Sequence, residues 1–351
     1  MPARNNRQTT LTDVAHAAGA SPMTVSRVVT GNGYVSSELR RKVERVIARL
    51  GYSPNRLARS LKGAPTRTIG VLLPDLGDPF AADLARGIEE VLLSRGYYPF
   101  VVSAEGIGRR AAAAITGFVD HRVSGAVLAT RSPDLTAGAL ADLVRKRFPV
   151  VGVGPEFDKE KVDRVSADYK QGALDATRHL IESGHRRIAF LGSSLNEAES
   201  QPRLAGYLEA LAERHIRRES GLIVAPARRS ACLSHSDGYE CMNRLLNLHN
   251  PPDAVFARSD FAAAGALLAM RERGIAVPDD IAIVGFDNVP SAAYLSPPLT
   301  TVNQFAFEQG KTAAGMLLGR IENERRGEPR EERFNCELVV RESSCVNAMA
   351  A

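Results

Sequence analysis

The chain has 351 residues, enough for two or three domains, and its 44% hydrophobic and 24% charged residues are ordinary for a globular protein. No apolar run approaches the roughly 20 residues of a membrane span, and the N-terminal MPARNNRQTT lacks the apolar segment of a secretory signal, which predicts a flexible basic arm on a cytoplasmic protein. The four cysteines (Cys232, Cys241, Cys336, Cys345) have no metal-ligand spacing, so we expect reduced thiols, no metal and no cofactor.

The net charge of +5 is unevenly distributed. Residues 1–62 contain 11 Lys and Arg but three Asp and Glu, whereas the rest of the chain contains 34 and 37. A small basic module followed by a slightly acidic body is typical of a protein whose first part binds a polyanion such as DNA.

The basic module contains the signals of two short helices joined by a tight turn. We expect Thr12 to cap the first helix and Gly19 to end it, because glycine adopts positive φ without steric cost. Ser21 followed by Pro22 predicts the start of a second helix, whose apolar face consists of Val25, Val28 and Val29. This layout predicts a helix-turn-helix, a DNA-binding motif. The simpler alternative is a small solvated helical bundle with incidental charge.

A third helix is expected over residues 37–50. Its apolar positions, which would close a small core, are Leu39, Val43, Val46, Ile47 and Leu50. Its opposite face is basic and contains Arg40, Arg41, Lys42 and Arg45.

From about residue 68, short β-branched runs alternate with helical patterns. The candidate strands are 69–73, 100–102, 125–129 and 150–153, then 187–192, 222–224, 254–257 and 281–285. The helical patterns between them include 81–95, 170–183, 203–214 and 261–274, and β-structure near 299–303 and 336–341 is expected to complete the sheets. Continuous apolar strands between helices predict parallel sheets covered on both faces, and two sets predict two Rossmann-like subdomains.

No catalytic constellation is present in the sequence. The chain lacks G-x-S-x-G, G-x-x-x-x-G-K-[ST] and H-E-x-x-H, and Pro155, directly after Gly152-Val153-Gly154, spoils G-x-G-x-x-G there. His185 is expected at a turn between a helix and a strand. We therefore predict no catalytic residues and no enzymatic activity.

Two segments carry a resemblance to a known family. T-D-V-A-x-x-A-G-x-S-x-x-T-V-S-R-V at residues 12–28 and L-G-Y-x-P-N-x-x-A-R-S-L at residues 50–61 resemble the LacI/GalR family of bacterial transcription regulators. The resemblance implies an N-terminal all-α helix-turn-helix domain with a hinge helix, joined to an α/β periplasmic-binding-protein-like core of two Rossmann-like subdomains. The implied boundaries are 1–10 for the arm, 11–53, 54–66 for the hinge and linker, 67–345 for the core, and 346–351 for a tail. The crossovers between subdomains are expected near 166–169, 300–303 and 325–332.

The resemblance also implies where DNA is bound. The second helix is the recognition helix in the major groove, with the DNA-binding residues Pro22, Met23, Thr24, Ser26 and Arg27. The hinge becomes helical on operator DNA and contributes Asn55, Arg56, Ala58, Arg59 and Leu61, with Leu61 as an apolar wedge in the minor groove. A homodimer on a near-palindromic operator would place two recognition helices in successive major grooves.

An effector is expected in a cleft at the carboxyl ends of the strands. Arg203 and Asp287 match the family's ligand-binding arginine and aspartate, Phe80 matches an aromatic, and Ser259 belongs to its N-D or S-D pair. Arg131 follows a predicted strand. The sixth candidate, Asp168, begins a helix-cap pattern. Each candidate also has a structural alternative: Phe80 as core, Arg203 as a cap or ion pair, Asp287 as the brace of a turn. The partner of Ser259, Asp260, is expected to cap the following helix.

The resulting hypothesis is a DNA-binding repressor controlled by a sugar, sugar acid or sugar phosphate. Arg131 together with Arg203 favours a ligand with a carboxylate or phosphate. The sequence leaves open whether the effector is an inducer or a corepressor. A global regulator that requires a protein corepressor, and a sugar-binding sensory protein, remain as alternatives.

Overall fold

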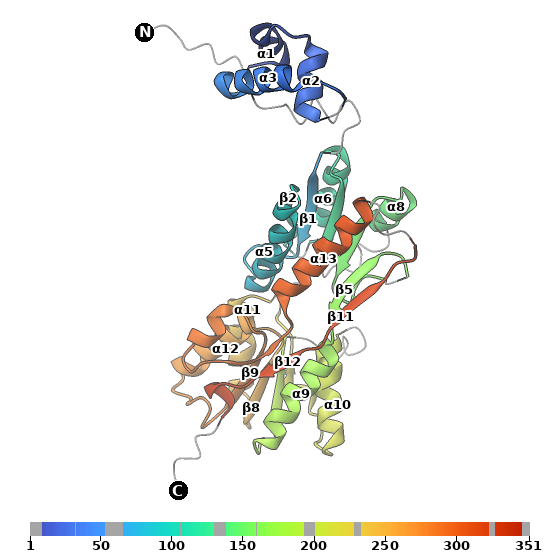
Figure 1. The fold of residues 1–351 in the computed structure, drawn as a ribbon. Helices are drawn as coiled ribbons and strands as arrows, with labels where there is room; N and C mark the ends of the chain where they lie inside the picture. Colours follow the sequence, from blue (N-terminus) through green and yellow to red (C-terminus); the bar gives the residue numbers. More distant parts are fainter. Residues whose placement is uncertain are drawn as a thin grey trace. The chain divides into compact units, whose positions relative to one another are not determined.

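The computed structural model describes residues 9–31, 33–52, 66–105, 107–129, 138–158, 160–192, 201–227, 233–322 and 327–345. The chain divides into two compact units, Met1–Thr66 and Arg67–Ala351 (Figure 1). The predictions for the first eight residues, for all five hinge residues, for Arg131 and for the tail 346–351 lie outside the described residues. No described helix is long and apolar enough to cross a membrane. Within the same residues, no group of His, Cys, Asp and Glu side chains is arranged to hold a metal ion.

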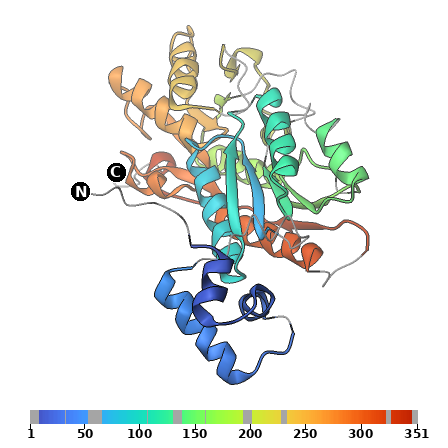
Figure 2. The same cartoon turned by 90° about the horizontal axis from the view of Figure 1, so that it is seen from above.

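The N-terminal unit consists of three helices, α1 (Leu11–Ala18), α2 (Pro22–Thr30) and α3 (Ser37–Leu50). The three helices pack together, as Figures 1 and 2 show. Their small core is made of Val14, Ala15, Ala18, Val25, Val28, Val43 and Val46. Of the other expected core residues, Val29, Leu39, Ile47 and Leu50 are partly buried against it. The structure therefore confirms the predicted three-helix module.

The caps of α1 and α2 are confirmed except at one residue. Gly19 ends α1 in the left-handed conformation, with φ 58°. Ser21 begins α2 and accepts a hydrogen bond from the backbone N–H of Thr24. The prediction of Thr12 as the first cap was wrong. Thr10 caps α1 instead, because the Asp13 carboxylate three residues later returns a bond to the Thr10 N–H (2.8 Å) and completes a capping box.

The second unit contains two six-stranded sheets. The first has the order β11-β5-β4-β3-β1-β2, and all its pairs are parallel. Its strands are β1 (Thr68–Leu73), β2 (Tyr98–Ser103), β3 (Gly125–Ala129), β4 (Val150–Val153), β5 (Asp163–Ala167) and β11 (Glu331–Phe334). Helices α5 (Pro79–Ser94) and α13 (Ala306–Ile321) cover one face, and α6 (Gly108–Asp120) and α8 (Ala139–Arg145) cover the other. Figure 2 shows helices on both sides of this sheet.

The second sheet has the order β12-β10-β9-β8-β6-β7, with only the β10–β12 pair antiparallel. Its strands are β6 (Ile188–Leu191), β7 (Ile223–Val224), β8 (Ala254–Ala257), β9 (Ala282–Asp287), β10 (Thr300–Asn303) and β12 (Glu337–Val339). Helices α9 (Tyr169–Glu182) and α10 (Pro202–Glu213) pack on one face, and α11 (His235–Leu246) and α12 (Asp260–Glu272) on the other. Short 3-10 helices occur at Ser220–Leu222, Pro290–Tyr294 and Glu342–Ser344.

The two predicted sets of parallel strands are confirmed, but the sequence did not predict β5 and β11. Their residues, DRVSA and EERF, include charged side chains and form no apolar run. Because β11 still belongs to the first sheet, the chain crosses to the second at 335–336, after the expected 325–332. It leaves the second sheet after β10, at 304–305, next to the expected 300–303, and the first crossing lies at residue 168.

Candidate DNA-binding surface and effector site

The N-terminal end of α2 presents a small set of exposed side chains. Pro22, Met23 and Arg27 are exposed, and the Met23 side chain is 66% accessible. Thr24 and Ser26 are half-buried. The Thr24 hydroxyl lies 2.9 Å from the Ser21 hydroxyl within the helix cap. Of the five predicted recognition residues, Pro22, Met23 and Arg27 therefore have the most freedom to contact base edges.

Helix α3 carries the basic face predicted for phosphate contacts. Arg41, Lys42 and Arg45 are exposed and Arg40 is half-buried. Arg41 and Arg45 donate through Nε to the carbonyls of Ser37 and Arg41, one turn back along the helix, which holds their stems along α3. Exposed arginine and lysine side chains on a helix suit the phosphate backbone, which positions a protein on DNA without reading sequence.

The centre of the predicted effector site is a buried arginine held between two rings. Arg203 occupies the first turn of α10 and is 8% exposed. Its guanidinium carbon lies 4.1 Å from the centroid of the Phe286 ring and 4.8 Å from that of Tyr169. Stacking against aromatic faces stabilises a guanidinium and fixes its plane. The structure thus brings Arg203 to the carboxyl end of β9, where Phe286 and Asp287 follow one another.

Asp287 lies at the end of β9 in an unusual turn. Its φ is 118° and that of Asn288 is 51°, both in the positive region that L-residues rarely occupy. The Asp287 carboxylate lies 3.6 Å from Arg203 Nη2 and accepts a hydrogen bond from Gln304 Nε2 (2.5 Å). Gln304 is fully buried, and its Oε1 has no hydrogen-bond partner among the described residues. The end of β9 therefore combines a carboxylate, a guanidinium and a buried amide oxygen, groups that suit a ligand rich in hydroxyls.

Asp260 stabilises the turn at the end of β9 through hydrogen bonds. It accepts hydrogen bonds from the Val289 N–H (2.9 Å) and the Thr301 hydroxyl (2.5 Å). A Cβ on Gly285 would stand 2.2 Å from Asp260 Oδ1, so only glycine allows this packing. Burial and the neighbouring Asp287 carboxylate raise the pKa of Asp260 well above its ordinary value.

The expected capping role of Asp260 was wrong. Ser259 is the cap of α12, and its hydroxyl accepts from the Ala262 N–H (3.2 Å). Asp260 is the first residue of the helix itself, and its carboxyl group is directed to the β9 turn. Ser259 is also buried, and its hydroxyl is engaged in the cap.

Two other predicted effector residues that the structure describes, Asp168 and Phe80, occupy structural positions. Asp168 caps α9 by accepting from the Gln171 N–H (3.1 Å) and forms an ion pair with Arg333 (2.8 Å). Phe80 belongs to the other sheet, on α5, where it is buried and donates its N–H to Asp78 (3.0 Å). No described hydrogen bond, ion pair or ring contact joins Phe80 to Arg203 or Asp287.

Several residues near Arg203 were missed by the sequence analysis. Tyr169 and Phe286 supply its aromatic walls, and Gln304 contacts Asp287. Cys336 also lies close: burial raises its pKa to about 12, and the charges of Arg203, Asp168 and Asp287 all act on it. The sequence did hold a local signal for the two aromatic residues, because each is adjacent to a predicted effector residue: Tyr169 follows Asp168 and Phe286 precedes Asp287.

His185 occupies the predicted turn between α9 and β6. Its Nδ1 lies 3.7 Å from the Asp253 carboxylate, and burial lowers its pKa.

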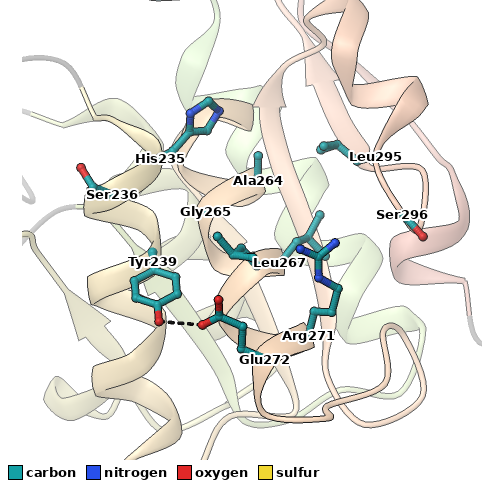
Figure 3. Close-up of a pocket in the computed structure, with 11 residues that line it drawn as sticks. His235, Ser236, Tyr239, Ala264, Gly265, Leu267, Arg271, Glu272, Leu295 and Ser296 are labelled. Atoms are coloured by element: carbon teal, nitrogen blue, oxygen red, sulfur yellow. Dashed lines mark hydrogen bonds between the residues drawn. The ribbon is translucent and has the colours of Figure 1, made fainter.

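A separate pocket of about 600 Å³ opens between α11 and α12 (Figure 3). Its apolar lining includes Ala264, Leu267, Leu268 and Leu295. At one edge the Tyr239 hydroxyl donates to Glu272 (2.7 Å), as Figure 3 shows. Neither Arg203 nor Asp287 lines this pocket, so it is distinct from the predicted effector site.

The two units define a class of protein: a helix-turn-helix module followed by a two-sheet, periplasmic-binding-protein-like domain. Comparisons with known proteins agree. Residues 10–55 match the model of bacterial regulatory proteins of the lacI family, and residues 177–344 match a periplasmic binding protein-like domain. The chain is 34% identical over 340 residues to the ribose operon repressor of Haemophilus influenzae, covering 96% of this chain and 97% of that protein.

Solved structures give the same result. The lac repressor dimer bound to operator and the anti-inducer ONPF has a TM-score of 0.84 and 26% identity, covering 97% of this chain and all of that one. The complex of the transcriptional regulator CelR with cellobiose has a TM-score of 0.68 and 32% identity, covering 96% and 100%. The chain belongs to the lacI family of bacterial regulatory proteins. This confirms the predicted fold class and a DNA-binding repressor controlled by a ligand.

Proposed function

We propose that this repressor binds a hydroxyl-rich effector, a sugar or sugar acid, between Arg203 and Asp287. The observation that carries the proposal is the group at the end of β9: a stacked guanidinium and a carboxylate 3.6 Å apart, with the buried Oε1 of Gln304 beside them. Asp287 and Gln304 Oε1 accept hydrogen bonds and Arg203 donates them, which matches the alternating capacity of vicinal hydroxyls. Arg203 also suits a carboxylate or phosphate on the ligand.

The relatives support a small polar effector. One is named a ribose operon repressor, and one solved structure is a complex with cellobiose. Arg131, Asp168, Phe80 and Ser259 remain proposed contributors. Asp168 and Ser259 would act mainly as caps that fix the starts of α9 and α12.

The proposal includes a homodimer, and two exposed apolar surfaces of the core suit a second copy. Strand β2 is an edge strand of the first sheet, and its Tyr98, Phe100 and Val101 side chains are exposed. Beside the α11–α12 pocket, Tyr294 is 88% exposed. Uncovered edge strands and apolar patches of this kind are typical of protein interfaces. Pairing would let two α2 helices engage a near-palindromic operator.

A cytoplasmic location and the absence of enzymatic activity belong to the same proposal, because the chain would act where its operator is. A global regulator with a protein corepressor remains the alternative. In that case the surface of the core, and not the Arg203–Asp287 group, would control DNA binding.

Two measurements test the proposed function. Selection from random duplexes identifies the operator, and a thermal-shift screen of sugars, sugar acids and sugar phosphates identifies the effector. Adding the effector to the protein–operator complex then determines whether it acts as inducer or corepressor. An effector that stabilises wild type and the double variant R203M/D287N equally would refute the site. A selection that enriches no sequence would refute the DNA-binding assignment.

A further inference from the structure

The exposed face of α2 combines one charged and one apolar side chain. Met23 and Arg27 are four residues apart, so they lie on the same side of the helix, and Arg27 Nη2 lies 3.8 Å from Met23 Sδ. Both side chains are exposed. A ligand that meets this face contacts the guanidinium and the thioether together.

The Arg27 side chain is guided by its surroundings. Gly33 has φ +93°, and a Cβ at this position would stand 3.3 Å from Arg27 Cδ. The stem of Arg27 therefore passes across Gly33 while its head meets the sulfur of Met23. A guanidinium held in this way is prepared for a bidentate contact with O6 and N7 of guanine, the commonest specific contact in the major groove.

The N-terminal end of α2 offers few other polar groups for base reading. The Ser21 and Thr24 hydroxyls lie 2.9 Å apart, and the Ser21 hydroxyl also accepts the Thr24 N–H. Pro22 has no N–H to donate. Beside Arg27, the helix thus presents the Pro22 ring and the Met23 thioether. In the major groove the one apolar feature of a base edge is the 5-methyl group of thymine.

We propose that Met23 makes the repressor read a thymine 5-methyl group next to the guanine read by Arg27. The inference rests on the proposed function, since it requires α2 in the major groove of an operator. Side chains four residues apart on a helix have Cβ atoms about 5–6 Å apart, whereas successive bases rise about 3.4 Å. The thymine therefore lies one or two base pairs from the guanine in each half-site.

The test uses the full chain and its selected operator. In synthetic duplexes, deoxyuridine replaces that thymine and removes only the methyl group, which is worth about fourfold in affinity per half-site and about 15-fold for both. In a third duplex, a 5-methylcytosine–guanine pair at the same position is compared with its unmethylated form, and the methyl group should again tighten binding. Anisotropy titrations at one fixed salt concentration measure the affinities.

Two variants locate the effect. Met23→Ala should lose the difference between thymine and deoxyuridine while keeping the preference for guanine. Met23→Gln should move the preference at this position toward adenine, which glutamine contacts through N6 and N7. Because Met23 is exposed, both variants should unfold at the wild-type temperature.

The outcomes separate this inference from the proposed function. Equal affinity of wild type for the thymine and deoxyuridine operators, or a selected operator without thymine within two base pairs of the guanine, overturns the role of Met23 and leaves the repressor assignment standing. A methyl effect that persists in Met23→Ala also overturns it. If selection enriches no sequence, both conclusions fall together.

Discussion

The sharpest perturbation of the proposed effector site is Asp287→Asn, because it removes charge and preserves shape. The Asp287 side chain is 2% exposed and accepts from Gln304 Nε2, a contact that an asparagine oxygen can keep. Alanine at this position would remove the acceptor oxygen beside Arg203 and Gln304 Nε2 as well as the charge, and breaking a buried ion pair from one side commonly costs about 3–5 kcal/mol of stability. The asparagine variant therefore isolates the effect on ligand binding better than truncation does.

The magnitude follows from the type of bond that is lost. A hydrogen bond to a charged group contributes about 1.5–3 kcal/mol and a neutral one about 0.5–1.5 kcal/mol. Replacing the carboxylate with an amide should thus cost about 1–1.5 kcal/mol for one ligand hydroxyl, which is about a tenfold weaker effector affinity. Truncation to alanine removes the whole bond, and if the variant folds we expect about a 100-fold loss. Operator affinity without effector should not change, because the predicted DNA contacts lie in the other unit.

The assay measures the bound fraction of a labelled operator against effector concentration for wild type, Asp287→Asn and Arg203→Lys. Arg203→Lys keeps the positive charge but loses the planar stacking on Phe286 and Tyr169, so it should also weaken the response. If the effector is an inducer, both variants remain on DNA at concentrations that release wild type. Wild-type response midpoints for both variants, with normal thermal unfolding, would show that the effector binds elsewhere.

Four further predictions follow from the same structure. The pKa of Asp260 is raised in the folded state, so the stability that this residue contributes is full below the ordinary carboxyl pKa of about 3.9 and is lost as pH rises. The unfolding free energy of wild type relative to Asp260→Asn should therefore fall with increasing pH. A difference between the two proteins that does not depend on pH would contradict this prediction. Gly206→Ala should lower the unfolding free energy by about 1–3 kcal/mol, since its Cβ would stand 2.2 Å from the Lys170 carbonyl, whereas Gly221→Ala, with nothing within 4 Å, should be nearly neutral by denaturant titration. Replacing Arg41, Lys42 and Arg45 with glutamine should weaken all duplexes alike and flatten the salt dependence measured by anisotropy; a change of selected sequence would argue for base contacts. Tyr294→Ser should shift the dimer toward monomer in sedimentation analysis, and unchanged dimerisation would remove Tyr294 from the interface.

The helix-turn-helix unit was predictable because its signals are local. Gly19 and Ser21 define the turn through their own backbone preferences, and the spacing of Val25 and Val28 defines the buried face of α2. The one wrong cap, Thr12, shows the limit of such reasoning. Thr12 is the second residue of α1, and the reciprocal bond from Asp13 makes Thr10 the cap.

The core was predictable as two parallel sheets but not in its pairing. The apolar runs of β3, β4 and β8 were located with correct bounds because they are buried on both faces. The charged β11 gave no such signal, since it is stabilised by long-range contacts such as the Arg164–Glu331 ion pair (2.6 Å) across to β5. The two residues of this pair are 167 positions apart, so the local hydrophobic pattern of the sequence cannot reveal it.

For the proposed effector site, the sequence named residues but not their surroundings. Arg203 and Asp287 were named from the resemblance, and the structure brings them together. Their environment is tertiary: Tyr169 and Phe286 come from α9 and β9, and Gln304 from the segment after β10. Sequence could name Asp260 as a neighbour of Ser259, but only the fold shows that its carboxyl group supports the β9 turn.

The distance between Arg203 and Asp287 bears on how an effector could act. At 3.6 Å the guanidinium nitrogen and the carboxylate oxygen are farther apart than the 2.7–2.9 Å of a charge-assisted hydrogen bond. A ligand hydroxyl that accepts from Arg203 and donates to Asp287 would replace a long ion pair with two short hydrogen bonds. Each charged group would still have a polar partner. Since burial has already removed most solvent from both groups, ligand binding would cost little further desolvation free energy there. A hydroxyl-rich molecule would thus gain affinity at a site whose charges are already paired. Its preference for the arrangement that offers both groups at once would supply the differential binding that a ligand-controlled repressor requires.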